Sequence, residues 1–125
     1  MSDAIPEIVF TAIIGRDSWL RQNTPTVVGF LRAMTEVHAF VNDPSNESVA
    51  RPIFQRITTP DIESLAGRGL VYIRDMGMWP DGLEVSPKAL ETTIDLMIRA
   101  NLLDSAQRGA VPGAFDRRYL DESRA

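Results

Sequence analysis

Residues 86–99 read SPKALETTIDLMIR, and this stretch carries the clearest helix signal in the chain. The Ser86 hydroxyl can accept an otherwise unpaired backbone N–H at a helix start, and Pro87 loses nothing there because its missing N–H would be unpaired anyway. Apolar residues then recur at the helical period, at Leu90, Ile94, Met97 and Ile98. The stretch therefore predicts an amphipathic helix from residue 87 to about 100.

The same pairing of a hydroxyl residue with proline occurs at Thr24-Pro25 and at Thr59-Pro60. Each pair predicts a capped helix start, so we expect one helix over 25–41 and another from Pro60. Gly67 and Gly69 weaken the second helix, and we favour helix over extended chain for residues 70–73. Two further helices are expected at 17–22 and 46–55, with Pro52 kinking or shortening the latter.

Residues 8–14 read IVFTAII, a short run rich in β-branched and aromatic residues that ends at Gly15. This composition predicts a buried strand with two apolar faces. No comparable second strand is evident, and a strand needs a partner for its backbone groups. The sequence thus predicts a single domain over residues 1–125, mainly α, with one short N-terminal β-strand followed by about five helices.

Composition excludes several classes of function. The 125 residues carry a net charge of −4, which disfavours a surface for nucleic acid or anionic membrane. There is no cysteine, so disulfides, thiolate nucleophiles and cysteine metal sites are absent. No run approaches the roughly 20 apolar residues of a membrane span, and the N-terminus lacks the charged start of an export signal. From these residues we expect neither membrane insertion nor export.

The residues most often used in catalysis do not form a recognisable motif. His38 is the only histidine, and its place on an apolar helix face predicts a hydrogen-bonded core or boundary residue. Gly67-Arg68-Gly69 lacks the third glycine and the preceding strand of a phosphate-binding loop, so a helix end or kink is expected. Trp19 and Trp79 are expected in a core or an interface. We therefore predict no catalytic residue, no metal ligand and no cofactor.

Several segments carry a resemblance to a known family. They are the run 8–14, the segment DSWLRQNTP at 17–25, VGFLRAM at 28–34, VNDP at 41–44, GLEVSPKAL at 82–90, the helix end at 96–103, and FDRRYL at 115–120. Read in order, they resemble the C-terminal part of a solute-binding protein of an ABC importer, of the nitrate, sulfonate, taurine and thiamine-pyrimidine type.

The resemblance implies a C-terminal fragment of a type II periplasmic-binding-protein-like α/β fold. It implies a role in uptake of a small anionic or heteroaromatic solute, a periplasmic or other extracytoplasmic location, and an ABC permease as partner of the full-length protein. The lobes that form the solute cleft would be missing, so we expect the fragment not to bind solute alone. Thr11, at the end of the predicted strand, is the candidate ligand contact.

Two alternatives stay open beside this transport component. One is a free-standing helical interaction module that oligomerises without a ligand. The other is an enzyme remotely similar to the pyrimidine-synthesis relatives of the fold, although the groups for catalysis are missing and we expect no enzyme. An unpaired strand edge recruits another strand, so a homo-oligomer formed through residues 8–14 is expected.

Overall fold

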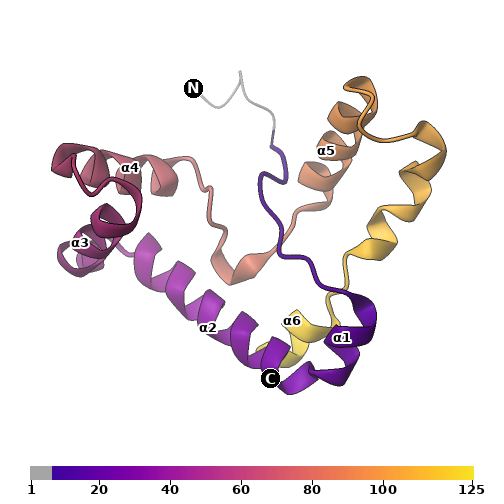
Figure 1. Cartoon of the computed structure of the whole chain (residues 1–125), viewed down its shortest axis with the longest axis horizontal. Coiled ribbons are helices and arrows are strands. Elements are labelled where there is room, and N and C mark those ends of the chain that lie inside the picture. The colour runs from indigo at the N-terminus through magenta and orange to yellow at the C-terminus, as the bar shows by residue number, and fades with distance from the viewer. Residues whose placement is uncertain (1–6) are drawn as a thin grey trace. The chain divides into compact units, whose positions relative to one another are not determined.

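A computed structural model describes residues 7–125 of the chain. The described residues form helices joined by short connections (Figure 1). The α-helices are α1 (Asp17–Gln22), α2 (Thr24–Asn42), α3 (Glu47–Thr58), α4 (Glu63–Asp75), α5 (Pro87–Arg99) and α6 (Arg118–Ser123). The 3-10 helices are η2 (Pro44–Asn46), η3 (Asp81–Leu83), η4 (Ser105–Ala110) and η5 (Pro112–Ala114).

No strand is present among residues 7–125, so the prediction of a strand at 8–14 and of an α/β binding-protein fragment is wrong. Residues 7–16 have no regular secondary structure, and Phe10 and Ile14 are 74% and 91% exposed. The Val9 N–H donates to the Thr93 hydroxyl of α5 at 2.8 Å. The physical reason is the missing partner: a β-rich run with no second strand satisfies its backbone elsewhere. The fold is all-α.

Of the three predicted helix caps, one is confirmed. The Ser86 side chain accepts the Ala89 N–H at 3.0 Å and begins α5 with Pro87 in the first turn. The Thr24 hydroxyl instead lies within hydrogen-bond distance of the carbonyls that end α1. Thr59 caps nothing, since α4 begins at Glu63 and the Thr59 hydroxyl is buried without a hydrogen-bond partner.

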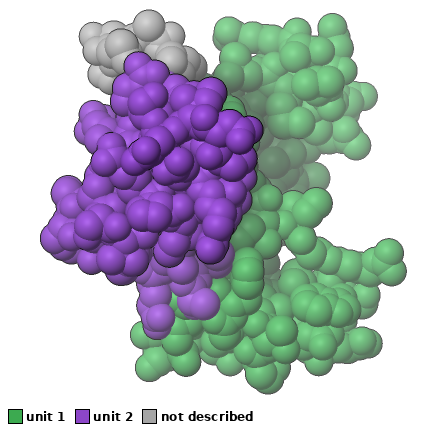
Figure 2. Space-filling view, turned by 60° about the vertical axis from the view of Figure 1, so that its left-hand side comes forward, with its two compact units in different colours: residues 1–32, 85–125 green, residues 33–84 purple. Residues whose placement is uncertain are grey.

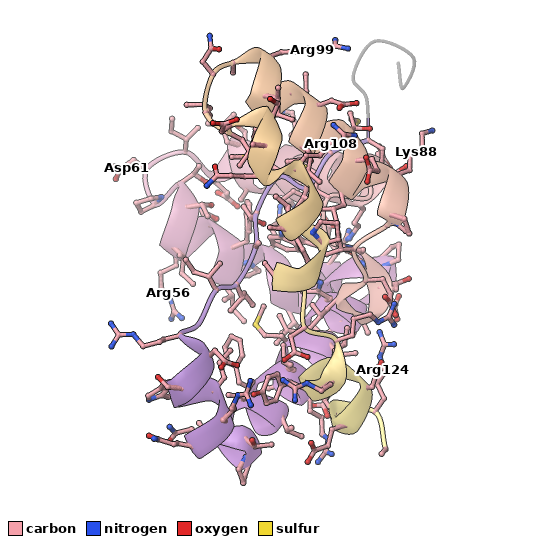
Figure 3. The ribbon with its side chains drawn as sticks, turned by 90° about the vertical axis from the view of Figure 1, so that its right-hand side faces the viewer. Arg56, Asp61, Lys88, Arg99, Arg108 and Arg124 are labelled. Carbon is pink, nitrogen blue, oxygen red and sulfur yellow. The ribbon has the colours of Figure 1, made fainter. Side chains whose placement is uncertain are left out.

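The chain divides into two compact units, one made of residues 1–32 and 85–125 and the other of residues 33–84 (Figure 2). In the first unit, α5 buries Ile94, which is 1% exposed, and α6 buries Tyr119. The Arg108 guanidinium of η4 pairs with both Glu91 and Asp95 of α5 and so ties the two segments together (Figure 3). Lys88, also labelled in Figure 3, is exposed in the first turn of α5.

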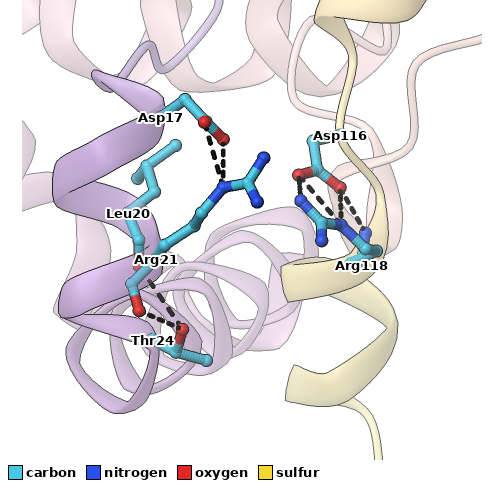
Figure 4. A network of polar contacts seen from close by, with 6 residues as sticks. All are labelled: Asp17, Leu20, Arg21, Thr24, Asp116 and Arg118. Carbon is cyan, nitrogen blue, oxygen red and sulfur yellow. Dashed lines mark hydrogen bonds and ion pairs between the residues drawn. The ribbon is translucent and has the colours of Figure 1, made fainter.

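Two ion pairs of the first unit lie near the ends of α1 and α6 (Figure 4). Within α1, the Arg21 Nε lies 3.0 Å from both carboxylate oxygens of Asp17. At the start of α6, the Arg118 guanidinium and backbone N–H both donate to Asp116. The hydrogen bonds from Arg118 hold the pKa of Asp116 at about 2, below its ordinary value.

The second unit is organised around Arg74, a largely buried residue of α4. Its Nε donates to the Val41 carbonyl at 2.6 Å, and its Nη1 pairs with Glu47 at the start of α3. One charged side chain thereby joins the end of α2, the start of α3 and the last turn of α4. Helix α4 contacts α3 and buries Leu70, which is 1% exposed, and Ala66, which is fully buried.

The segment after α4 is held against α2 by polar and aromatic contacts. The half-buried His38 ring stacks on Trp79 with a centroid distance of 5.8 Å, and its Nδ1 lies 3.2 Å from the Pro80 carbonyl. The Asn42 amide donates to the Trp79 carbonyl and to Asp81, both at 2.9 Å. The prediction of a hydrogen-bonded boundary histidine is confirmed. Trp19, expected in a core or interface, is 50% exposed.

Candidate functional site

Helix α3 presents an apolar stripe to solvent. Val49, Ile53 and Ile57 follow one another at intervals of four residues and are 54%, 47% and 72% exposed. Residues four apart lie on one helix face, so these side chains form a continuous row along three turns. We call this row the α3 stripe.

An adjoining face of α3 packs within the second unit. Ala50 is buried, and the Phe54 ring approaches Gly69 of α4 so closely that a Cβ on that glycine would lie 3.1 Å from the ring. Helix α3 is therefore apolar on two faces, and α4 covers only one of them. Pro52 lies inside the helix and has no N–H to donate, yet the helix continues to Thr58.

A shallow groove of ≈ 450 Å³ lies between α3 and α4. Helix α3 contributes one turn to its lining, at Glu47 and Arg51. Helix α4 contributes the residues of a single face, namely Ser64, Gly67, Arg68, Val71, Tyr72 and Asp75. We call this hollow the α3/α4 groove.

Arg51 lies against the backbone of α4 inside this groove. A Cβ added to Gly67 would lie 2.3 Å from one terminal nitrogen of Arg51 and 2.8 Å from its Cζ. Such distances are far below any real contact, so the guanidinium occupies the space that a side chain at position 67 would need. Helix α4 continues past Gly67 and Gly69 to Asp75. The prediction of a helix end or kink at this run is therefore wrong.

The charges around the groove are unevenly distributed. The Glu47 carboxylate is already paired with Arg74, so it does not neutralise Arg51. Within residues 7–125, no ion pair or hydrogen bond is formed by the side chains of Arg51 and Arg68. Asp75 lines the far end. One end of the groove is therefore basic and the other acidic.

Thr11, the ligand contact implied by the family resemblance, is exposed in the irregular segment before α1. It lines neither the α3/α4 groove nor a hollow of ≈ 410 Å³ in the first unit, which is formed by Ile98 and residues 101–105. In the described part of the chain, no group of three or more histidine or carboxylate side chains is placed to hold a metal ion. None of the helices seen here is both long and apolar enough to cross a bilayer.

No protein-family model, curated protein or solved structure matches this chain. The resemblance to importer solute-binding proteins accordingly stays a prediction. The strand at residues 8–14, the first segment of that resemblance, is not formed.

Both features of the second unit were missed by reasoning from sequence. The spacing of Val49, Ile53 and Ile57 is visible in the sequence and could have shown the α3 stripe. The groove could not have been found that way, because Arg51 and Arg68 lie on different helices and line one hollow only when those helices pack together.

Proposed function

We propose that this chain is a helical self-association module that uses the α3 stripe as its contact surface. The observation that supports this proposal is the exposure of three large apolar side chains on successive turns of one helix. Contiguous apolar surface of this kind on a soluble domain marks an interaction site.

A second copy of the chain is the occupant that best fits the stripe. Ile53 lies at its centre, with Val49 and Ile57 four residues away on either side. In an antiparallel helix pair with a two-fold axis at Ile53, Ile53 meets its own mate and Val49 meets Ile57 of the other copy. The stripe is thus self-complementary, as a two-fold interface requires.

The charges beside the stripe permit such a pair. Arg56 is the charged residue nearest the stripe on the helix surface, and it lies beside the row of Val49, Ile53 and Ile57 rather than within it. Glu47 is engaged by Arg74 away from the stripe. The contact is short, so we expect a weak dimer at the low end of interface sizes, with a dissociation constant on the order of 10–100 µM.

Sedimentation equilibrium of the full chain over a range of concentrations tests the proposal. Ile57→Glu places a charge in the proposed contact and should give a monomer at every concentration, with unchanged helical circular dichroism. Leu102→Glu is the matched control, since Leu102 is 73% exposed against 72% for Ile57 and belongs to the other unit. This control should dimerise like the wild type.

A third variant separates this contact from the one expected through the N-terminal segment. Phe10→Asp charges the run 8–14 and should leave the dimer intact if the α3 stripe is the contact. A monomeric Phe10→Asp together with a dimeric Ile57→Glu would contradict the proposal and favour the segment 7–16. A wild-type chain that is monomeric at 1 mM would contradict self-association altogether.

A further inference from the structure

We infer that the α3/α4 groove binds a small aromatic phosphomonoester, with the phosphoryl group between Arg51 and Arg68 and the ring on Tyr72. This inference is independent of the proposed self-association, because the groove and the α3 stripe involve different residues of α3.

Arg51 and Arg68 form no ion pair with a carboxylate in the described residues. Several arginines of the described chain have carboxylate partners, namely Arg21 with Asp17, Arg74 with Glu47, Arg108 with Glu91 and Asp95, Arg117 with Asp121, and Arg118 with Asp116. Others, such as Arg56, have none in this part of the chain, but they do not share a groove with a second arginine. Arg51 and Arg68 line one groove and have no such partner there. Two guanidinium groups brought into the same hollow repel each other, and an anion between them removes that repulsion.

Gly67 leaves space beside α4 that the Arg51 guanidinium occupies. Glycine inside a helix is unfavourable relative to alanine, yet Gly67 lies in the middle of α4. Its missing side chain lets the Arg51 guanidinium rest against the helix backbone, within the space that a Cβ would fill. The Arg51 side chain is exposed and lies beside α4, where its guanidinium is available to an anion in the groove.

Helix α4 places a hydroxyl, a guanidinium and an aromatic ring in a row along the groove. Ser64, Arg68 and Tyr72 follow at intervals of four residues and line the same groove. Ser64 offers a hydroxyl donor beside Arg68, while the half-exposed Tyr72 offers an aromatic face one turn further on. A guanidinium fork matches phosphate oxygens, and two of them favour a dianion over a carboxylate.

The far end of the groove limits what the rest of the ligand can be. Asp75 would repel a second anionic group, so the part of the ligand beyond the ring should be uncharged. The two arginines, Tyr72 and Asp75 therefore favour a ligand with one phosphoryl group, one aromatic ring and no second charge.

Titration of the full chain with phenyl phosphate, followed by ¹H–¹⁵N NMR at low salt, tests the inference. We expect saturable shifts at residues of the groove, weaker binding of inorganic phosphate, and no binding of phenol. Arg51→Gln and Arg68→Gln should each weaken binding about 10-fold or more. Arg56→Gln is the matched control, because Arg56 is an arginine of the same helix outside the groove, and it should bind like the wild type (Figure 3).

Gly67→Ala provides a variant that retains both arginines. The new methyl group displaces the Arg51 guanidinium from α4, so binding should fall several-fold while the helical circular dichroism is kept. Wild-type affinity in folded Gly67→Ala, or in both arginine variants, would overturn the assigned site. Equal affinity for inorganic phosphate and phenyl phosphate would overturn the contribution of Tyr72. The Ile57→Glu monomer should bind phenyl phosphate normally, which separates this inference from the proposed self-association.

Discussion

At the scale of single residues, the most distinctive polar group is the Asp116 carboxylate. It accepts two hydrogen bonds from the Arg118 Nε, at 2.9 and 3.1 Å, and one from the Arg118 backbone N–H at 3.1 Å. These donors favour the charged form, and the pKa of Asp116 falls to about 2. The charged carboxylate therefore contributes to the stability of the folded chain wherever it remains ionised.

The lowered pKa predicts a defined pH window for this contribution. The ordinary pKa of this carboxyl is 3.8, so the stabilisation is fully present at pH values well above 3.8 and is lost as the pH falls towards about 2. Asp116→Asn should therefore be less stable than the wild type at pH 6, with the difference narrowing between about pH 4 and pH 2. Urea unfolding at a series of pH values measures this.

Arg118→Gln tests the cause of the shift. Since the Arg118 hydrogen bond is the main reason for the low pKa, its loss should remove the same acid-dependent difference. An Asp116→Asn variant whose stability deficit stayed constant down to pH 2 would contradict this assignment.

At the scale of helices, the three hydroxyl–proline pairs show what local sequence can and cannot specify. Ser86 caps α5 because the cap, the proline and the apolar period all lie within one turn of each other. At Thr59 the same local pattern fails. The Thr59 N–H bonds back to Gln55 and so completes the end of α3, and α4 begins four residues later.

The two sites should respond differently to removal of their hydroxyl groups. Ser86→Ala loses the bond to the Ala89 N–H and should destabilise the chain by about 1 kcal/mol. Thr59→Val removes a buried oxygen that has no partner and keeps the side-chain shape, so it should be neutral or stabilising by up to about 1 kcal/mol. Chemical denaturation measures both. A Thr59→Val variant as destabilised as Ser86→Ala would show that the Thr59 hydroxyl is hydrogen-bonded in solution.

Helix prediction succeeded where the determining contacts are local, and failed where they are not. The expected helix at 17–22 is α1, and residues 70–73 do continue α4 as favoured. Pro52 does not shorten its helix, since α3 runs from Glu47 to Thr58 with Pro52 inside it. The run 8–14 has the composition of a strand, but strand formation depends on a distant partner that nothing within the run can specify.

The same reasoning explains why the candidate site was not predicted. The family resemblance implies a ligand contact at Thr11, at the end of a strand, and that strand does not form. Arg51 and Arg68 line one groove because α3 packs beside α4, and Gly67 leaves room for the Arg51 guanidinium there, which depends on packing between helices. The α3 stripe, by contrast, is a feature of one helix and its period is present in the sequence.

At the scale of the whole molecule, the burial of large side chains is limited. Among residues 7–125, only Leu70 and Ile94 are large side chains less than 2% exposed. Hydrophobic burial is the dominant stabilising term in folding, so an isolated copy should be only marginally stable. Any contact that buries the α3 stripe would then contribute a noticeable share of the total.

This coupling predicts a melting temperature that depends on protein concentration. A self-associating chain is stabilised by mass action, since the partner binds the folded form. The wild-type Tm should rise between 5 µM and 500 µM, a range of roughly 100-fold that spans the expected dissociation constant. The Tm of Ile57→Glu should stay constant over the same range. Differential scanning fluorimetry and calorimetry measure this, and a wild-type Tm independent of concentration would contradict the coupling.

The basic residues of the chain have one practical consequence for such experiments. Of 13 basic residues, Lys88 is the only lysine, and it is exposed in the first turn of α5. An amine-reactive fluorophore can therefore attach to a single side chain, with the α-amino group as the other amine. In a two-fold dimer, symmetry would relate the two labels on Lys88, so resonance energy transfer between them would report one distance. Lys88 thus provides a native attachment site for a fluorophore that lies outside both the α3 stripe and the α3/α4 groove.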